Sequence, residues 1–139
     1  MKLVKLNGDD MKLVEKARLL LEKRGSDISG VSAGVLTVGG EEFYGLCIDA
    51  KTATVGMCAE FSAVGAMVTA GERKISTMVA VTRREDGYAI LPPCGKCRDL
   101  ARAFGDPYVI LQTGGSVRDA AKVRVSGLVP YPWDGAPAR

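Results

Sequence analysis

The chain of 139 residues contains no histidine, so proton transfer and metal binding must depend on other side chains. It has only four cysteines, too few for the disulfide framework of a small secreted protein. The uncharged stretch 61–71 is far shorter than the roughly 20 apolar residues that cross a bilayer, and it is expected to form a buried helix. The first ten residues become charged before an apolar signal core develops. We therefore expect a reducing, cytoplasmic setting without a membrane partner.

The net positive charge is small, and the basic residues are not concentrated in one region. The chain has 19 basic and 16 acidic residues, and the basic ones are scattered apart from Arg83 and Arg84. This distribution argues against binding to a nucleic acid polymer. Apolar residues make up 47% of the chain, without repeats or low-complexity tracts. We expect one domain over residues 1–139, which is long enough to bury a core without a disulfide or a structural metal.

Hydrophobic spacing predicts an amphipathic first helix that begins near Asp9 or Asp10, either of which can cap it, and that stops at Gly25. The segments 31–38 and 41–48 are predicted to form an antiparallel hairpin around Gly39 and Gly40, because glycine tolerates the positive φ of tight turns. The following elements are predicted as helix 58–71, strand 74–82, short strand 88–91, helix 94–104 and strand 108–112. This alternation predicts an α/β sandwich with helices on both faces of a mixed sheet.

Cysteines lie at the starts of two predicted helices. Cys58-Ala59-Glu60 opens one helix, and Pro93-Cys94-Gly95-Lys96-Cys97 opens the next. Helices that follow neighbouring strands begin at the same edge of a sheet, so we expect the two starts to meet around one metal. A structural zinc site has four protein ligands, whereas a catalytic site has three and leaves one position for water. Three cysteines favour a catalytic Zn²⁺ held by Cys58, Cys94 and Cys97.

Glu60 is predicted to transfer protons. It follows Cys58 by two positions and therefore points to a different side of the helix start. Hydrolytic deamination takes protons from water and delivers them to a ring nitrogen and to the departing amine, and one carboxylate can perform each transfer in turn. Three thiolates give Zn²⁺ a formal charge of −1, which the helix starts and the neighbouring Arg98 are expected to offset.

Other interpretations stay open at this stage. The segment from Cys94 to Cys97 also fits a dithiol redox pair. Cys47 is a candidate fourth ligand of a structural zinc site, although a small buried residue at a strand end is the better interpretation of it. Glu60 fits a solvated carboxylate at a helix start.

The two motifs resemble those of the cytidine deaminases, in which C-A-E and P-C-G-x-C-R appear; here they are Cys58 to Glu60 and Pro93 to Arg98. The resemblance extends over nearly the whole chain. It implies a three-layer α/β/α sandwich with about five strands, one zinc ion per subunit held by Cys58, Cys94 and Cys97, and proton transfer by Glu60. It also implies a homotetramer whose sites are completed by neighbouring subunits.

A shorter likeness concerns the C-terminal tail. Tyr131-Pro132-Trp133-Asp134-Gly135 resembles the Y-x-W-E-G ending of the blasticidin-S deaminases. Tyr131 and Trp133 are thus candidates for stacking on a substrate base, but covering the core or a subunit contact would equally explain them.

The second predicted strand departs from the family pattern. Cytidine deaminases usually show G-x-N-x-E there for the ribose hydroxyls, whereas this chain has Cys47 and Asp49 at those two positions. Phe61 stands where arginine commonly follows C-A-E, and Ser29 and Gly30 stand where an aromatic residue is common. We therefore expect a zinc-dependent hydrolase that releases ammonia from a cytosine-type nucleoside or analogue, such as cytidine, deoxycytidine or a compound like blasticidin S. The alternatives are another aminated base, such as a purine, or a non-catalytic structural-zinc module. The candidate substrate-binding residues are Cys47, Asp49, Ala59, Pro93, Tyr131 and Trp133.

Overall fold

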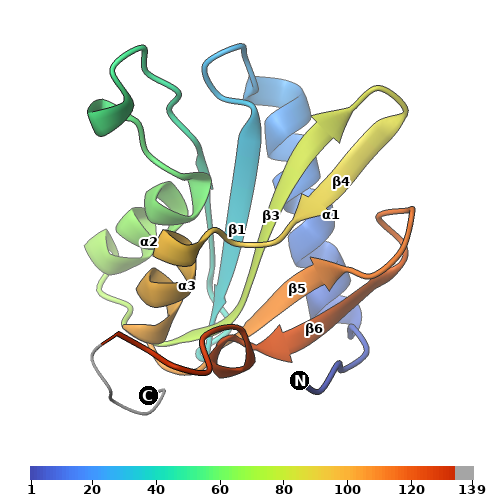
Figure 1. Cartoon of the computed structure of the whole chain (residues 1–139). Helices are drawn as coiled ribbons and strands as arrows, with labels where there is room; N and C mark the ends of the chain where they lie inside the picture. The colour runs from blue at the N-terminus through green and yellow to red at the C-terminus, as the bar shows by residue number, and fades with distance from the viewer. Residues whose placement is uncertain (134–139) are drawn as a thin grey trace.

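The computed structural model describes residues 1–133, apart from the side chain of Ala53. Figure 1 shows the elements in chain order. They are α1 (Gly8–Arg24), β1 (Val31–Thr37), β2 (Glu42–Leu46), α2 (Ala59–Thr69), β3 (Ile75–Arg84), β4 (Gly87–Leu91), α3 (Gly95–Arg102), β5 (Tyr108–Gln112) and β6 (Ala120–Arg124), with short 3₁₀ turns at Ala53–Val55 and Val125–Leu128. Each predicted helix and strand is present within a few residues of its expected bounds.

The sheet is mixed, and within the described chain it has six strands instead of the expected five or so. The main order is β2-β1-β3-β5-β6. One edge of β3 pairs with β1, and the other edge is shared between β5, opposite Thr77 and Met78, and β4, opposite residues 80–84. The pairing of β3 with β5 is parallel, and the other pairings are antiparallel. The apolar strand 74–82 was correctly predicted to be central.

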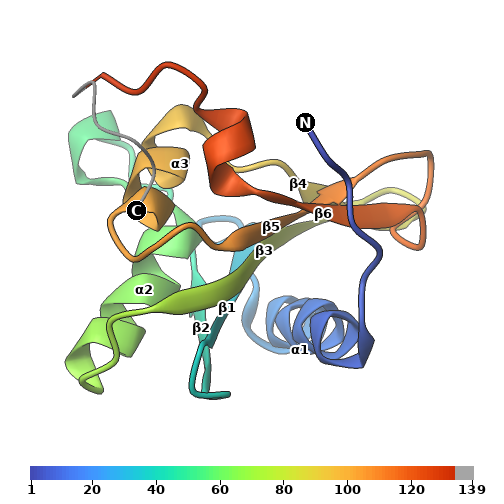
Figure 2. The same ribbon diagram turned by 90° about the horizontal axis from the view of Figure 1, so that it is seen from below.

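Helices cover both faces of the sheet, as predicted (Figure 2). Helix α1 packs on one face, where Leu13, Ala17 and Leu21 join the buried strand residues Val79, Val81, Ile90 and Ile110. Helices α2 and α3 pack on the other face, where the core includes Ala59, Ala63, Val64, Met67, Met78, Ala101 and Val109. The molecule is therefore a three-layer α/β/α sandwich.

Helix α1 is capped by Asn7, so the predicted cap at Asp9 or Asp10 is wrong. The Asn7 side chain accepts a hydrogen bond from the Asp10 backbone, and the Asp10 carboxylate accepts one from the Asn7 backbone, both at 2.9 Å. Asp10 also forms a buried ion pair of 2.7 Å with Lys122 of β6. A single residue thus completes the cap and joins α1 to the strand that sequence reasoning missed.

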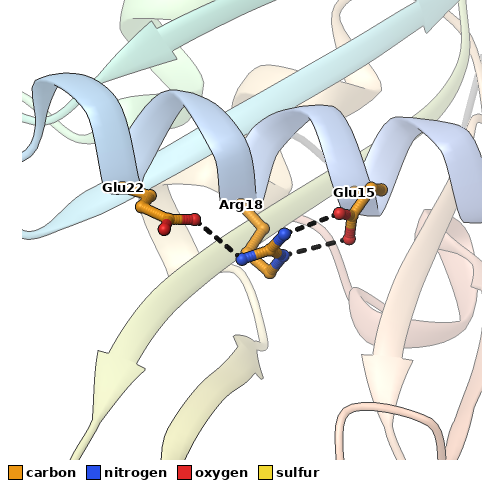
Figure 3. Close-up of polar contacts among 3 residues, drawn as sticks. All are labelled: Glu15, Arg18 and Glu22. Atoms are coloured by element: carbon orange, nitrogen blue, oxygen red, sulfur yellow. Dashed lines mark hydrogen bonds and ion pairs between the residues drawn. The ribbon is translucent and has the colours of Figure 1, made fainter.

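The exposed side of α1 carries a charged cluster. Arg18 contacts the carboxylates of Glu15 and Glu22 (Figure 3), and its guanidinium lies 5.1 Å from the centre of the Tyr88 ring. The cluster therefore links the helix surface to β4 on the face opposite α2 and α3.

Helix α2 carries no charge after Glu60, yet one side of it faces outward. Ala63, Val64 and Met67 are buried, whereas Gly65 and Ala66 are exposed. The helix that was expected to be buried is therefore buried along one side only in this single chain. Among the described residues, no helix has the length and hydropathy that a membrane crossing requires.

Candidate active site

The last residues of β2 and β4 align with adjacent residues of the central strand β3. Leu46, the last residue of β2, is opposite Ser32 of β1, and Ser32 is opposite Val81 of β3. Leu91, the last residue of β4, is opposite Ala80 of β3. The prediction that α2 and α3 follow neighbouring strands is wrong, because β1 and β3 separate β2 from β4. The register, and not strand adjacency, brings the two helix starts together.

The loop between β2 and α2 closes on itself before α2 begins (Figure 1). The backbone groups of Ile48 and Met57 exchange two hydrogen bonds of 2.9 Å, which returns the chain to the end of β2. Cys58 is then the N-cap residue of α2, and Cys94 is the N-cap residue of α3. Both thiols therefore lie at the positive end of a helix dipole, as predicted.

Three sulfur atoms form one compact group. The Sγ atoms of Cys58, Cys94 and Cys97 all lie within 4.8 Å of one another, and those of Cys58 and Cys94 are 3.9 Å apart. Tetrahedral zinc with Zn–S bonds of about 2.3 Å places neighbouring sulfurs about 3.8 Å apart. The spacing and the donor type therefore fit Zn²⁺, and the predicted assembly of these three cysteines is confirmed.

The thiols differ in acidity. Burial raises the pKa of Cys58 and of Cys97, and the Glu60 carboxylate raises the pKa of Cys97 further. Burial acts in the same direction at Cys94, but the backbone N–H groups of Cys97 and Lys96 help to bring its pKa below the ordinary value. Metal binding at this group must therefore displace protons.

A cavity of about 490 Å³ opens beside the sulfur group. Its volume suits a nucleoside-sized molecule. Its walls come from β1, the β2–α2 loop, the start of α2, β3 and the β4–α3 loop. The lining residues are Val31, Cys47, Ile48, Asp49, Ala50, Gly56, Met57, Cys58, Ala59, Glu60, Ala80, Leu91, Pro92, Cys94 and Lys96.

Glu60 lines this cavity although the protein covers it almost completely, leaving 6% of its surface exposed. The solvated-carboxylate interpretation is therefore wrong. The Glu60 carboxylate does not belong to the sulfur group that can hold a metal ion. A buried carboxylate that faces a cavity beside a metal site is placed to exchange protons with a molecule bound there.

Cys47 and Asp49 also line the cavity, at the positions where the family pattern has its ribose contacts. Cys47 is buried, its sulfur accepts a hydrogen bond from the Val31 backbone at 3.3 Å, and its thiol donates to Asp49 at 3.6 Å. Asp49 is exposed. Within the described residues Cys47 is outside the metal-holding group, so the four-cysteine site is not formed.

Arg98 contacts the backbone around the site. Its Nε donates to the Pro93 carbonyl at 2.9 Å, and its Nη1 donates to the Leu128 carbonyl at 3.2 Å. These bonds hold the turn before Cys94 against the 3₁₀ turn Val125–Leu128. The role of Arg98 as a cation beside the thiolates stays a prediction.

Of the other candidate substrate-binding residues, some line the cavity and others do not. Ala59 lines the cavity, whereas Pro93 is buried outside it and its neighbour Pro92 takes that place. Tyr131 and Trp133 are 95% and 97% exposed and do not line the cavity, so the idea that they cover the core is wrong. The rest of that tail motif, Asp134 and Gly135, lies outside the described residues.

Sequence reasoning missed two parts of the wall. Lys96, an exposed residue of α3, and Ala80, a buried residue of β3, are not among the predicted site residues, yet both line the cavity. The position of Lys96 between two cysteines at a helix start was the available signal for its role.

Comparison with protein families identifies this arrangement. Residues 8–113 match the model of the cytidine and deoxycytidylate deaminase zinc-binding region. The chain belongs to this family. The deaminase family accounts for both cysteine motifs and for the fold, and it makes the protein a zinc-dependent hydrolytic deaminase, as predicted.

Relatives with established names agree with this assignment. The chain is 28% identical over 140 residues to a blasticidin-S deaminase of Bacillus cereus, covering 96% of this chain and 98% of that protein. It is 25% identical over 93 residues to a cytidine deaminase of Mycoplasma genitalium, covering 66% of this chain and 70% of that one.

Solved structures share the fold. The cytidine deaminase from Bacillus anthracis superposes with a TM-score of 0.76 at 21% identity, covering 91% of this chain and 90% of that one. The cytidine deaminase from Mycobacterium leprae gives a TM-score of 0.72 at 18% identity, covering 91% and 99%. The six-stranded sheet with helices on both faces is thus the deaminase architecture.

Proposed function

We propose that residues 1–139 form one deaminase domain that releases ammonia from a cytosine-type nucleoside or nucleoside analogue. The observation that carries this proposal is the position of buried Glu60 beside a three-sulfur group at the wall of one cavity. Cys58, Cys94 and Cys97 would hold one zinc ion, and zinc supplies Lewis acidity that makes a water molecule nucleophilic near neutral pH.

The protein's own residues then manage the protons. Water adds to the amino-bearing carbon of the base, the carbon–nitrogen bond breaks, and ammonia leaves, so that an oxo group replaces the amine. Glu60 accepts a proton from water, gives one to the ring nitrogen, and assists the transfer of another to the departing amine. The buried position of Glu60 limits competing exchange with bulk solvent. The apolar walls formed by Val31, Ala80 and Leu91 favour a flat base over water.

The substrate preference is proposed from the part of the cavity wall that Cys47 and Asp49 form. Cys47 and Asp49 occupy the positions of the family's ribose contacts, and a thiol is a poor substitute for a carboxamide. The similarity to the blasticidin-S deaminase over nearly the full length supports a modified cytosine nucleoside as the preferred substrate. A deaminase of another aminated base, such as a purine, is the alternative. Contacts from Tyr131 or Trp133 would require a neighbouring subunit, because neither lines the cavity of its own chain.

A panel of substrates tests the proposal. Purified zinc-loaded protein would be incubated with cytidine, deoxycytidine, blasticidin S, cytosine, adenosine and guanine, and ammonia would be measured by a coupled assay. We expect release from the cytosine nucleosides, with the highest kcat/KM for an analogue whose sugar differs from ribose. Release from purines alone would support the alternative, and no release from any compound would contradict the proposal.

We further propose a homo-oligomer, a tetramer by family resemblance, in the cytoplasm. The uncharged outer side of α2 and the exposed Ile48, Val55, Tyr131 and Trp133 support burial against further subunits. A site that needs three free thiols supports a reducing compartment. Light scattering after size-exclusion chromatography would test the assembly, and a monomer at micromolar concentration would contradict it.

A further inference from the structure

The zinc-loaded site carries an excess of negative charge. Three thiolates and Glu60 would contribute four negative charges against the two positive charges of a zinc ion, and the exposed Asp49 adds another at the cavity wall. Cys97 is fully covered and Glu60 is 6% exposed, so solvent screens part of this charge poorly. Buried charge is costly unless a cation or a dipole offsets it. The two helix starts offset some of it, but they provide only partial charges.

Lys96 provides a whole positive charge at this place. Among the described lining residues it is the one cation of the cavity, and it stands between Cys94 and Cys97 in sequence. Its backbone N–H already lowers the pKa of the Cys94 thiol. The Arg98 guanidinium, by contrast, hydrogen-bonds the Pro93 and Leu128 carbonyls and so fixes the backbone.

An aromatic contact holds the Lys96 side chain. Its Nζ lies 4.6 Å from the centre of the Phe61 ring, within the range of a cation–π interaction. Phe61 directly follows Glu60 on α2, whereas Lys96 is on the first turn of α3. The contact therefore joins the two helix starts that carry the cysteines.

We propose that Lys96 is a positioning residue of the zinc site, whose ammonium group, held over Phe61, offsets the negative charge of the loaded site and joins the starts of α2 and α3. This inference rests on the proposed zinc-dependent function. Lys96 acts on the metal through charge and through the placement of the helices. It is not assigned a contact with the reacting atoms.

Zinc affinity tests the inference without an activity assay. The zinc dissociation constant would be measured by competition with a chromophoric chelator for the wild type and for Lys96→Gln, Lys96→Arg and Phe61→Leu. We expect Lys96→Gln to weaken zinc binding by about threefold to tenfold and Lys96→Arg to restore most of it, because arginine keeps the charge and stacks on rings. Phe61→Leu should weaken zinc binding similarly. The double variant Lys96→Gln with Phe61→Leu should lose less zinc-binding free energy than the sum of the losses in the two single variants.

Two controls separate local charge from other effects. Lys74→Gln removes the same charge from an exposed residue about 20 Å along the strand from Ala80, and we expect zinc affinity within twofold of the wild type. Raising the ionic strength from about 0.05 M to about 0.5 M should reduce the difference between the wild type and Lys96→Gln, since salt screens exposed charges. A purely structural role predicts no such dependence and no rescue by arginine.

The outcomes distinguish this inference from the proposed function. If wild-type protein binds one zinc and Lys96→Gln binds it equally well, the role of Lys96 is overturned while the deaminase proposal stands. An equal loss in Lys74→Gln, or a failure of Lys96→Arg to restore affinity, also overturns it. If wild-type protein binds no stoichiometric zinc, the proposed function fails and the inference fails with it.

Discussion

The sulfur atoms of Cys58 and Cys94 lie 3.9 Å apart, although 36 positions separate the two residues in the chain. Each residue precedes the first turn of its helix, and Cys97, one turn into α3, completes the group. Two helix starts therefore supply the whole donor set, and the fold leaves one side of it open to the cavity.

The first prediction compares two buried cysteines. Cys97 is in the sulfur group and Cys47 is not, although the two are 0% and 5% exposed. Cys97→Ser should weaken zinc binding by roughly 100-fold or more, because serine replaces a thiolate ligand with a poor donor. Cys47→Ser should keep one zinc per chain. Elemental analysis after dialysis measures both, and loss of zinc from Cys47→Ser would indicate a four-sulfur site.

The second prediction concerns protons released on metal binding. Burial raises the pKa of Cys58 and Cys97, so both thiols hold their protons near neutral pH in the metal-free protein. Zinc binds thiolates, so it must displace these protons, and its affinity should rise as the pH rises. We expect the logarithm of the association constant to increase by at least about two per pH unit between about pH 6 and about pH 8, one for each of these two protons. Chelator competition at several pH values measures this slope, and a flat profile would contradict it.

Glu60→Gln provides the third prediction. The amide has nearly the same shape as the carboxylate but cannot accept and return a proton, so turnover should fall by roughly 100-fold to 10,000-fold. Zinc content should not change, because Glu60 is outside the metal-holding group. Glu85→Gln, in the exposed β3–β4 turn, serves as the control and should keep both zinc and turnover. Near-normal turnover in Glu60→Gln would remove Glu60 from the mechanism.

Local patterns made much of this site predictable. Two cysteine motifs at helix starts and an acid two positions after the first cysteine predicted a three-cysteine group beside a carboxylate. The three sulfurs lie together in the structure, and Glu60 lines the adjoining cavity. The central strand could be predicted because its apolar run reflects burial on both faces. Such features depend on neighbours within a few positions, which a single sequence records directly.

Long-range pairing could not be predicted in the same way. The alignment of Leu46 and Leu91 across β1 and β3 depends on three strand registers, and no local pattern specifies how they combine. Strand β6 was missed because AAKVR lacks a clear apolar alternation. Its Lys122 is buried in an ion pair with Asp10 and over the Tyr108 ring, and both partners are distant in sequence. The location of Lys96 in the cavity wall likewise follows from how α3 docks near α2.

Close packing between β2 and α2 gives the last prediction. A Cβ on Gly45 would press against the backbone nitrogen of Ala63 and lie 2.6 Å from the Cβ of Ser62. Gly45→Ala should therefore lower the free energy of unfolding by about 1–3 kcal/mol and weaken zinc binding, because α2 carries Cys58. A Cβ on Gly65 would meet no atom within 4 Å, so Gly65→Ala should raise the free energy of unfolding by up to about 1 kcal/mol. Urea unfolding at fixed zinc concentration compares the two variants, and equal stability would show that β2 and α2 pack less closely than this.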